Sequence, residues 1–355
     1  MSQKGKKIWK IIGSIVLAIV IILGAFLAYL TIQEYRPDPI ETQEIPENTD
    51  KVSIEDEFSI VTYNVGYGGL SQETDFFMDG GTEVQPESEE VVQRNLDGIA
   101  KILNENVADA YFIQEVDLDS KRSYHINEKE FLEQETGKSG IFAYNFKSQI
   151  VPYPLPMIGH VESGLLTLLN NKVDESMRVS LPESFTWPVK TCNLKRCLMK
   201  TYLPIEGSDK KLVLINFHLE AYDSGEGKIK QSKMLAEILE EEYEKGNYVI
   251  AGGDFNQTFP SVDKYPFLGE GNWKPGVIDA EMLPEGFHFA IDDRYPTCRL
   301  LNEPYTGSYD TSQVYVLDGF IVSPNVSVTS INVINTDFEF TDHQPVKVTF
   351  EFNQD

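Results

Sequence analysis

The sequence feature that most constrains the fold is the stretch from Tyr248 to Thr258, which reads YVIAGGDFNQT. It begins as a short apolar run of strand-forming residues and then reaches two adjacent glycines, which end a strand and open a turn. Asp254 and Asn256 follow, and in an extended backbone residues two apart lie on the same side, with Phe255 pointing the other way. The stretch predicts a buried strand that presents an acid and an amide at a sheet edge. A turn without chemical function is the alternative for this stretch alone.

Four other strand-like runs also end in acidic, amide or imidazole side chains. They are Ser59–Asn64, Ala110–Glu115, Leu212–His218 and Val314–Asp318. A sixth stretch, Thr341–Val346 (TDHQPV), leads into a final strand. Polar groups gathered at strand ends form the sites of many α/β proteins. The set of six in this order is therefore more informative than any one member.

In this order the six stretches resemble the endonuclease/exonuclease/phosphatase superfamily, the group around DNase I, sphingomyelinases and inositol-polyphosphate 5-phosphatases. The resemblance extends from Phe58 to Phe352. It implies an α/β fold of four layers, in which two central mixed β-sheets are flanked by helices. Without the resemblance, the pattern of elements supports either an α/β or an α+β fold. The resemblance also implies that a phosphodiester or phosphomonoester is hydrolysed by metal-assisted attack of water.

The N-terminal segment differs in composition from the rest of the chain. Residues 1–10 contain four lysines, and residues 11–32 contain no charged side chain. At about 1.5 Å per residue, a helix over 11–32 spans a bilayer core of about 30 Å. Because the lysines precede this run, the positive-inside rule places 1–10 in the cytosol and the rest of the chain outside. We expect a single-pass anchor in the cell membrane; a cleavable signal peptide, with its typical apolar run of roughly 7–15 residues, is the alternative.

The remaining chain divides into a linker and one domain. Residues 33–57 are rich in Glu, Pro and Thr without apolar periodicity, which predicts an extended extracellular linker. Residues 58–355 form the expected catalytic domain. Amphipathic helices are predicted from Ser88 to Leu103 and from Ile229 to Lys245, because apolar residues recur there at helical spacing.

Several segments of the domain are predicted as loops. The turn-rich regions at 66–87 and 260–312 are expected to form the rim of a site, since loops this long are often functional. Three prolines within Phe142–Gly159 predict an irregular surface loop there. A further strand is predicted at Ser163–Leu169.

The charge of the chain limits its partners. The formal net charge is −26, and the first 34 residues hold four of the 30 basic and one of the 56 acidic residues, so the remainder carries −29. No general nucleic-acid-binding surface is expected, because such binding depends on Lys and Arg that displace counterions. An anionic lipid surface would also repel this domain. Phosphate chemistry remains compatible with the charge, since a divalent metal supplies local positive charge.

The chain has three cysteines. Cys192 and Cys197 flank four residues, a spacing that leaves a small disulfide loop and two free thiols equally open. Cys298 would be left over. No second Cys or His pair stands at zinc-binding spacing, so a zinc site is not expected. We expect a monomer.

The resemblance assigns three residues to a metal, which we expect to be Mg²⁺, with Mn²⁺ or Ca²⁺ as alternatives. Glu115, in the sequence IQEV, matches the Gln-Glu motif of the family, and Mg²⁺ prefers carboxylate oxygen while retaining several waters. Asn64, in TYNV, matches the first motif. Asp342 would make a second carboxylate contact. Some relatives have an acid two positions after the Asn, where this chain has Gly66, and this difference puts a second metal site in doubt.

The resemblance gives catalytic roles to five more residues. His343 would exchange a proton with the reacting water or the leaving group, and Asp318 would orient it. Asp254 would position or activate the attacking water. Asn256 would donate to a phosphoryl oxygen, and His218 would contact the phosphate or the leaving group. The other histidines are predicted to be satisfied core residues: His125, His160 and His288.

The substrate is less constrained than the chemistry. The segment from His218 to Ser224 is similar to the corresponding segment of bacterial sphingomyelinases, whereas Pro296–Arg299 lacks the Trp and Asp of the 5-phosphatase motif. Candidate substrates are therefore phospholipids, nucleic acids and small organic phosphates. A binding protein without activity on the same scaffold is the alternative from another class.

Overall fold

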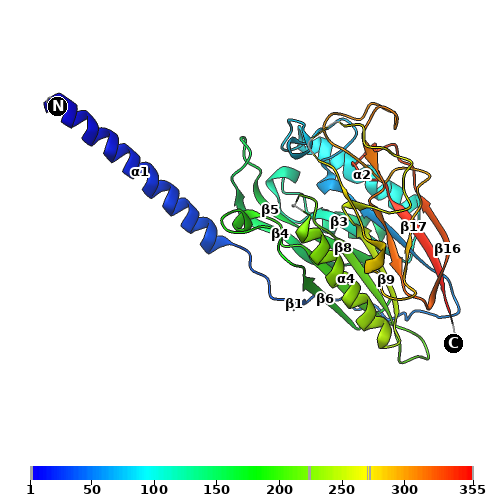
Figure 1. Cartoon of the computed structure of the whole chain (residues 1–355). Helices are drawn as coiled ribbons and strands as arrows, with labels where there is room; N and C mark the ends of the chain where they lie inside the picture. Colours follow the sequence, from blue (N-terminus) through cyan, green and yellow to red (C-terminus); the bar gives the residue numbers. More distant parts are fainter. Residues whose placement is uncertain (1–2, 223–224, 270, 272, 354–355) are drawn as a thin grey trace.

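A computed structural model describes residues 3–222, 225–269, 271 and 273–353. Within this part of the chain, two β-sheets face each other at the centre of the domain (Figure 1). One has seven strands in the order β1-β6-β7-β8-β9-β15-β12, and the other has six in the order β16-β17-β2-β3-β5-β4. Both contain parallel and antiparallel pairs, so both are mixed, as predicted.

The strands of the seven-stranded sheet are β1 (Ile40–Thr42), β6 (Glu175–Ser180), β7 (Cys197–Pro204), β8 (Lys211–His218), β9 (Tyr248–Asp254), β15 (Asp318–Val322) and β12 (His288–Ala290). Those of the six-stranded sheet are β16 (Val326–Val333), β17 (Val346–Phe352), β2 (Phe58–Asn64), β3 (Ala110–Asp117), β5 (Gly159–Leu169) and β4 (Ser139–Val151). Two small ribbons pair β10 (Gln257–Thr258) with β11 (Gly276–Val277), and β13 (Cys298–Arg299) with β14 (Val314–Tyr315).

The main core lies between the two sheets, and each sheet has a second apolar face. In β8, Leu212 and Leu214 belong to the core between the sheets, whereas Val213 and Ile215 belong to the core on the outer face. Successive side chains of a strand point to opposite faces, so a strand buried on both sides requires an unbroken apolar run. This requirement explains why the strand-forming runs of the sequence are continuously apolar.

Helices cover the outer faces. α2 (Glu89–Glu105) and α3 (Glu128–Thr136) lie on the six-stranded sheet, and α4 (Glu226–Glu244) lies on the seven-stranded sheet. Val92, Leu96 and Ile99 of α2 pack against the six-stranded sheet. The four layers confirm the predicted fold class. Five short 3₁₀ helices occur in the connections of the described chain: η1 (Gly66–Gly68), η2 (Phe77–Asp79), η3 (Lys121–Ser123), η4 (Val189–Cys192) and η5 (Ala280–Met282).

One local prediction is wrong, and one helix was not predicted. The segment Phe142–Gly159 is not one irregular loop, because β4 continues through Val151 and forms a long hairpin with β5. All three prolines of the segment follow the last strand residue, so only the hairpin connection is irregular. α3 was not predicted, since only Phe131 and Leu132 of its nine residues are large and apolar.

The N-terminal helix α1 (Gln3–Gln33) extends away from the domain (Figure 1). Its most apolar window has a mean hydropathy of 3.0, and no residue of that window is buried. The helix is therefore long and apolar enough to cross a membrane, which is the extent of what its length and composition show.

The segment at 33–57, predicted as a linker, is packed against the domain. β1 pairs with β6 as an edge strand, with Ile40 opposite Val179. Val52 forms a bridge with Ile205, and Glu34 is buried against Lys195 with an Oε1–Nζ distance of 3.0 Å. The segment is extended, but these contacts attach it to the fold.

All three cysteines are free thiols in the structure. The Cys192 Sγ lies 3.9 Å from the Val189 carbonyl oxygen, and the Cys197 Sγ lies 3.7 Å from the Tyr144 carbonyl oxygen. The spacing of Cys192 and Cys197 left a disulfide and two free thiols open, and the structure shows free thiols.

Candidate active site

Polar ends of five strands and the residues before a sixth meet at one edge of the two sheets. β2 and β3 run parallel, as do β8 and β9, so their C-terminal residues lie at the same edge of each sheet. Asn64, His218 and Asp254 are the last residues of their strands, and Glu115 lies two residues before the end of β3. β17 runs antiparallel to β2, so the segment before it returns to the same edge and adds Asp342 and His343.

Asp318 begins a strand, which corrects the prediction that it ends one. The predicted run is interrupted at Val316 and Leu317, and β15 begins at Asp318. Because β15 is antiparallel to β9, its first residue stands directly opposite Asp254, the last residue of β9. The Thr297 hydroxyl accepts hydrogen bonds from the backbone N–H groups of Leu317 and Asp318, at 2.8 and 3.0 Å, and fixes this start.

Asn64 lies at the centre of the site. Its Nδ2 is 3.1 Å from Glu115 Oε1, 3.2 Å from Asp254 Oδ2 and 3.5 Å from His343 Nε2. Its Oδ1 accepts a hydrogen bond from the Gly66 N–H at 3.0 Å. One buried amide therefore connects both sheets and three of the predicted functional side chains.

Glu115 occupies an irregular position in β3. Its φ is +56°, a left-handed conformation that is uncommon for residues other than glycine, and the register with β5 shifts between Ile113 and Val116. Such a bulge redirects a side chain. The Glu115 carboxylate thereby joins the site while its neighbours on either side remain buried in the sheet.

His343 and Asp318 form a close pair. The His343 Nδ1 donates to Asp318 Oδ2 at 2.9 Å, and its Nε2 lies 3.7 Å from Asp254 Oδ2. Burial alone would lower the pKa of His343, but Cys298 and the carboxylates of Asp318 and Asp254 raise it well above its usual value. Burial raises the pKa of Cys298 to about 12, so Cys298 is a neutral thiol and the carboxylates carry the local negative charge.

His218 and Asp254 form the second close pair. His218 Nε2 is 3.3 Å from Asp254 Oδ2, and burial lowers the pKa of His218 well below its usual value. The His218 Nδ1 is buried without a hydrogen-bond partner among the described residues. Burial also raises the pKa of Asp254 to about 7, with a further increase from Asp318 that opposes the lowering by His343. The site thus holds a neutral imidazole, a charged imidazole and an acid that titrates near neutrality.

Asn256 does not have the extended backbone that was predicted. Its φ is +50°, and its N–H donates to Asp254 Oδ1 at 2.8 Å, which forms a tight turn after β9. Its Nδ2 donates to the carbonyl oxygen of Leu219 at 2.9 Å. In this structure Asn256 therefore orients Asp254 and the segment after β8, while Phe255 is buried in the outer core as expected.

Asp342 lies next to His343 and is buried. Its Oδ1 accepts from the Thr341 hydroxyl at 3.2 Å, and its Oδ2 is 3.9 Å from His343 Nε2. Burial raises the pKa of Asp342 to about 6; His343 opposes this shift and Glu115 adds to it. The influence of Glu115 shows that these two carboxylates are electrostatic neighbours.

The chemistry of the donor set fits a hard divalent cation. Glu115 and Asp342 offer carboxylate oxygens, and together with the buried Asp254 they concentrate negative charge that a cation would neutralise. Two close groups of metal-ligand type also surround His343, one with Asp254 and Asp318 and one with Cys298 and Asp342. A histidine held in its charged form is a poor ligand, so the carboxylates near Glu115 are the better site.

Several site residues were not predicted. Gln114 Nε2 donates to Asn216 Oδ1 at 2.8 Å and joins the two sheets beneath the site. Tyr222 donates from its hydroxyl to Asp79 Oδ1 at 2.8 Å, which connects η2 to the segment after β8. The Gln114–Asn216 pair could have been found from the sequence, because each is an amide within an otherwise apolar strand. The second pair joins two loops, for which spacing gives no signal.

Arg196 also adjoins the site without having been predicted. It precedes β7, whose pairing with β8 places it near His218, and its charge contributes to the lowered pKa of that histidine. Its Nε and Nη1 are buried without a hydrogen-bond partner among the described residues.

The remaining histidines lie outside the site, but they are not core residues as predicted. His125 and His288 are exposed, and His160 is half-buried. His125 contacts Asp119 through its Nδ1. In the segment 218–224, for which a likeness to sphingomyelinases was predicted, Asp223 and Ser224 lie outside the described residues.

The chain belongs to the Endonuclease/Exonuclease/phosphatase family, whose sequence profile matches residues 61–343. A search of curated protein sequences finds no match. Among solved structures, the endonuclease/exonuclease/phosphatase from Beutenbergia cavernae DSM 12333 is similar with a TM-score of 0.57 and 15% identity, covering 84% of this chain and 72% of that chain.

Two further solved structures show the same fold. The endonuclease/exonuclease/phosphatase from Bacteroides vulgatus has a TM-score of 0.54 and 14% identity, covering 84% of this chain and 99% of that chain. D. rerio TDP2, complexed with a single-strand DNA product, has a TM-score of 0.51 and 17% identity, covering 83% and 99%.

Proposed function

We propose that the protein is a metal-dependent phosphoester hydrolase, held at the cell membrane by α1. The observation that carries this proposal is the convergence around Asn64, where Glu115, Asp254 and His343 come from both sheets. Metal-assisted hydrolysis needs a cation site, a group that deprotonates water and donors for the phosphate oxygens. This edge of the sheets provides residues for all three.

Glu115, Asp342 and Asn64 are the residues that would hold Mg²⁺, or Mn²⁺ or Ca²⁺ in its place. When bound, the cation supplies charge that offsets the phosphate oxygens and assists the ionisation of water. Glu115 is the only one of the two carboxylates with a partly exposed side chain, at 26%, and so it faces the side from which solvent reaches the site.

Asp254 is proposed to accept the proton of the attacking water. A base is most effective when its pKa lies near the working pH, and the pKa of Asp254 is raised to about 7 by burial. Asn64 Nδ2 and the Asn256 N–H each donate to one of its oxygens, so the carboxylate is held in a fixed orientation.

The two histidines are proposed to have different roles. His343, kept protonated by Asp318, would donate from Nε2 to a phosphoryl oxygen or to the leaving group. His218 is neutral, and its unpaired Nδ1 would make one further hydrogen bond to the substrate. Asn256 is proposed as a positioning residue, because its amide is already bonded to Leu219.

The topology is part of the proposal. Lys4, Lys6, Lys7 and Lys10 precede the apolar run, so the N-terminus would be cytosolic and the domain extracellular. The substrate is proposed to be a phospholipid, a nucleic acid or a small organic phosphate, and the net charge of the domain disfavours adhesion to nucleic acid through a broad surface.

The test is hydrolysis by the full chain in lipid nanodiscs, with Mg²⁺ and with EDTA. The substrates are plasmid DNA, RNA, sphingomyelin and bis-p-nitrophenyl phosphate. We expect cleavage of at least one substrate with Mg²⁺ and none with EDTA. The variant His343→Ala should be inactive, whereas His288→Ala, which changes an exposed histidine, should be fully active. Full turnover by His343→Ala, or turnover in EDTA, would contradict the proposal.

A further inference from the structure

The connection between β4 and β5, residues 152–158, exposes several large apolar side chains. Leu155 is 85% exposed and Tyr153 is 70% exposed, and Met157 is also exposed. We name these three residues the apolar loop surface. Single exposed apolar residues are common on proteins, but several gathered on one projecting loop indicate a contact with another apolar phase or molecule.

The apolar loop surface stands on a small core of its own. Ile158 packs with Val151 and Val161 of the hairpin and with Leu194, which follows η4. Lys121 donates from Nζ to the carbonyl oxygen of Met157 at 3.0 Å. These contacts hold the loop at a defined place relative to η4.

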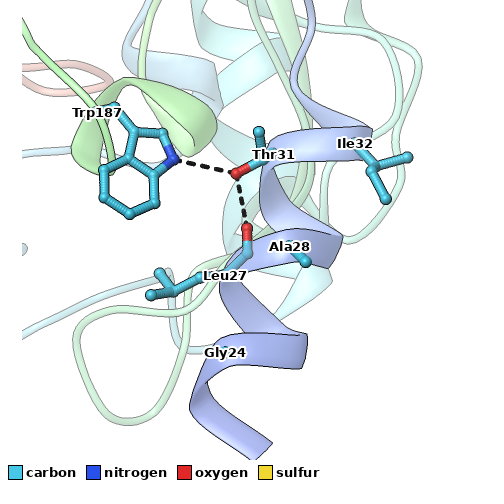
Figure 2. Close-up of a pocket in the computed structure, with 6 residues that line it drawn as sticks. All are labelled: Gly24, Leu27, Ala28, Thr31, Ile32 and Trp187. Atoms are coloured by element: carbon cyan, nitrogen blue, oxygen red, sulfur yellow. Dashed lines mark hydrogen bonds between the residues drawn. The ribbon is translucent and has the colours of Figure 1, made fainter. Parts of the chain in front are cut away.

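The segment around η4 also contacts the end of α1. Trp187 donates from its Nε1 to the Thr31 hydroxyl at 3.1 Å, and Figure 2 shows its indole beside the last turns of α1. Tyr35, just after α1, lies edge-to-face with Tyr144 of β4 at a ring-centroid distance of 6.2 Å. Tryptophan and tyrosine concentrate at the level of lipid headgroups. If α1 crosses a bilayer, these aromatic contacts mark where the bilayer surface meets the domain.

We propose that the apolar loop surface enters the outer leaflet of the bilayer that α1 crosses. This inference rests on the proposed function of α1 as an anchor. Figure 1 shows the β4–β5 connection projecting from the side of the domain that α1 approaches. α1 and the loop both contact the segment around η4, so they lie on one face of the domain. A bilayer that surrounds α1 therefore also reaches the loop.

The same loop borders the candidate active site. The Tyr153 ring lies 5.8 Å from the Phe77 ring in an edge-to-face arrangement. Phe77 begins η2, and Asp79 at the end of η2 is bonded to Tyr222 beside the site. A bilayer that contacts the apolar loop surface therefore lies next to the rim of the site. The substrate class that fits this arrangement is an amphiphilic phosphoester presented by the membrane.

The contact is apolar rather than electrostatic. The chain after residue 34 carries a formal charge of −29, and a negatively charged membrane would repel it. Transfer of apolar side chains out of water is favourable whatever the charge of the lipid, and salt does not screen it as it screens charges.

The experiment places a nitroxide label at position 155 of the full chain in nanodiscs of uncharged phosphatidylcholine. The background variant is Cys192→Ser, because Cys197 and Cys298 are buried thiols. Val107→Cys is the matched control: Val107 is 66% exposed and precedes β3, whose other end carries the site. Leu23→Cys reports on α1. Collisions with oxygen, which concentrates in lipid, and with a water-soluble nickel complex measure the surroundings of each label.

We expect the labels at 23 and 155 to collide with oxygen and the label at 107 to collide with the nickel complex. A label at 155 in water, with that at 23 in lipid, would overturn this inference and leave the anchor intact. A label at 23 in water would overturn both. Spin–spin broadening at 155 between two copies would assign the surface to self-association and would also overturn it.

A second readout connects the surface to catalysis. We expect Leu155→Asp to lower the rate of sphingomyelin hydrolysis in nanodiscs by about tenfold, equivalent to about 1.4 kcal/mol, without changing hydrolysis of bis-p-nitrophenyl phosphate. Equal loss on both substrates would show a general defect and would overturn the inference. Hydrolysis of another substrate of the panel but not of sphingomyelin by the unmodified chain would overturn the inference alone, and hydrolysis of none of them would contradict the proposed function.

Discussion

Two buried carboxylates lie near opposite ends of β9 and differ in their surroundings. Glu242, near the end of α4 and just before β9, is fully buried, and its oxygens accept from Lys200 Nζ at 2.8 Å, Tyr202 Oη at 2.7 Å and Asn247 Nδ2 at 3.1 Å. Asp254, the last residue of β9, is buried to a similar degree but lies among other acids and two histidines.

Their pKa values move in opposite directions. Burial alone would raise the pKa of Glu242, but its hydrogen bonds from Lys200 and Tyr202 lower it below the usual value. Burial raises the pKa of Asp254 to about 7, and Asp318 raises it further. Glu242 and Asp254 are equally buried, yet Glu242 is held as an ion and Asp254 titrates near neutral pH. The neighbouring groups therefore decide which protonation state is favoured.

The largest effect, on the rate of hydrolysis, is expected at Asp254. Asp254→Asn keeps the shape of the side chain and removes the proton acceptor, so hydrolysis should fall by about 10²–10⁴-fold. The thermal midpoint should remain close to that of the unmodified protein, because His343 keeps its closer ion partner, Asp318, at 2.9 Å. Steady-state rates and calorimetry check both parts. Retention of most activity would assign proton transfer to another group.

At Glu242 we expect the opposite: a loss of stability without a loss of activity. Glu242→Gln leaves the buried Lys200 ammonium without its ion partner, and breaking a buried pair costs about 3 kcal/mol of the free energy of unfolding. Activity of the folded variant should be unchanged, since Glu242 is remote from the site. Urea unfolding gives the free energy, and a stability equal to that of the unmodified protein would refute the comparison.

The smallest effect is the pH dependence of the difference in stability between the unmodified protein and Glu242→Gln. The pKa of Glu242 is lowered on folding, so its stabilising contribution is present above its unfolded value of about 4.5 and is lost as the pH falls through the folded value. The gap in stability between the unmodified protein and Glu242→Gln should therefore be largest near pH 7 and shrink near pH 3.5. A gap that does not change with pH would show that packing, not charge, produces it.

The family resemblance predicted the four layers of the fold, and the residue pattern itself predicted most of the strands that carry the site. Continuous apolar runs ending in polar residues gave β2, β8 and β9, because burial on both faces permits no other composition. The length of β4 was hidden by prolines that follow it. β1 could not be predicted, since a three-residue edge strand depends on its partner β6 rather than on its own sequence.

The gathering of the site residues was predictable, but their individual conformations were not. The resemblance placed Asn64, Asp254 and His343 together, and the structure brings them within hydrogen-bond or ion-pair distance. The left-handed conformation of Glu115 arises from tertiary contacts that local propensity does not encode, whereas Asn256 adopts one that asparagine tolerates. The link between Asp79 and Tyr222 joins residues 143 positions apart and has no signal in spacing.

The pairing of β1 with β6 and the burial of Glu34 against Lys195 limit how far the domain can move relative to α1. If the segment 33–57 were flexible, the domain could move freely around the end of α1 and meet molecules in the surrounding solution. A domain fastened immediately after its helix remains at one height and one tilt. If α1 anchors the domain in a membrane, as proposed, its encounters would be set by lateral diffusion in the membrane plane, and the density of targets per unit area would govern its rate.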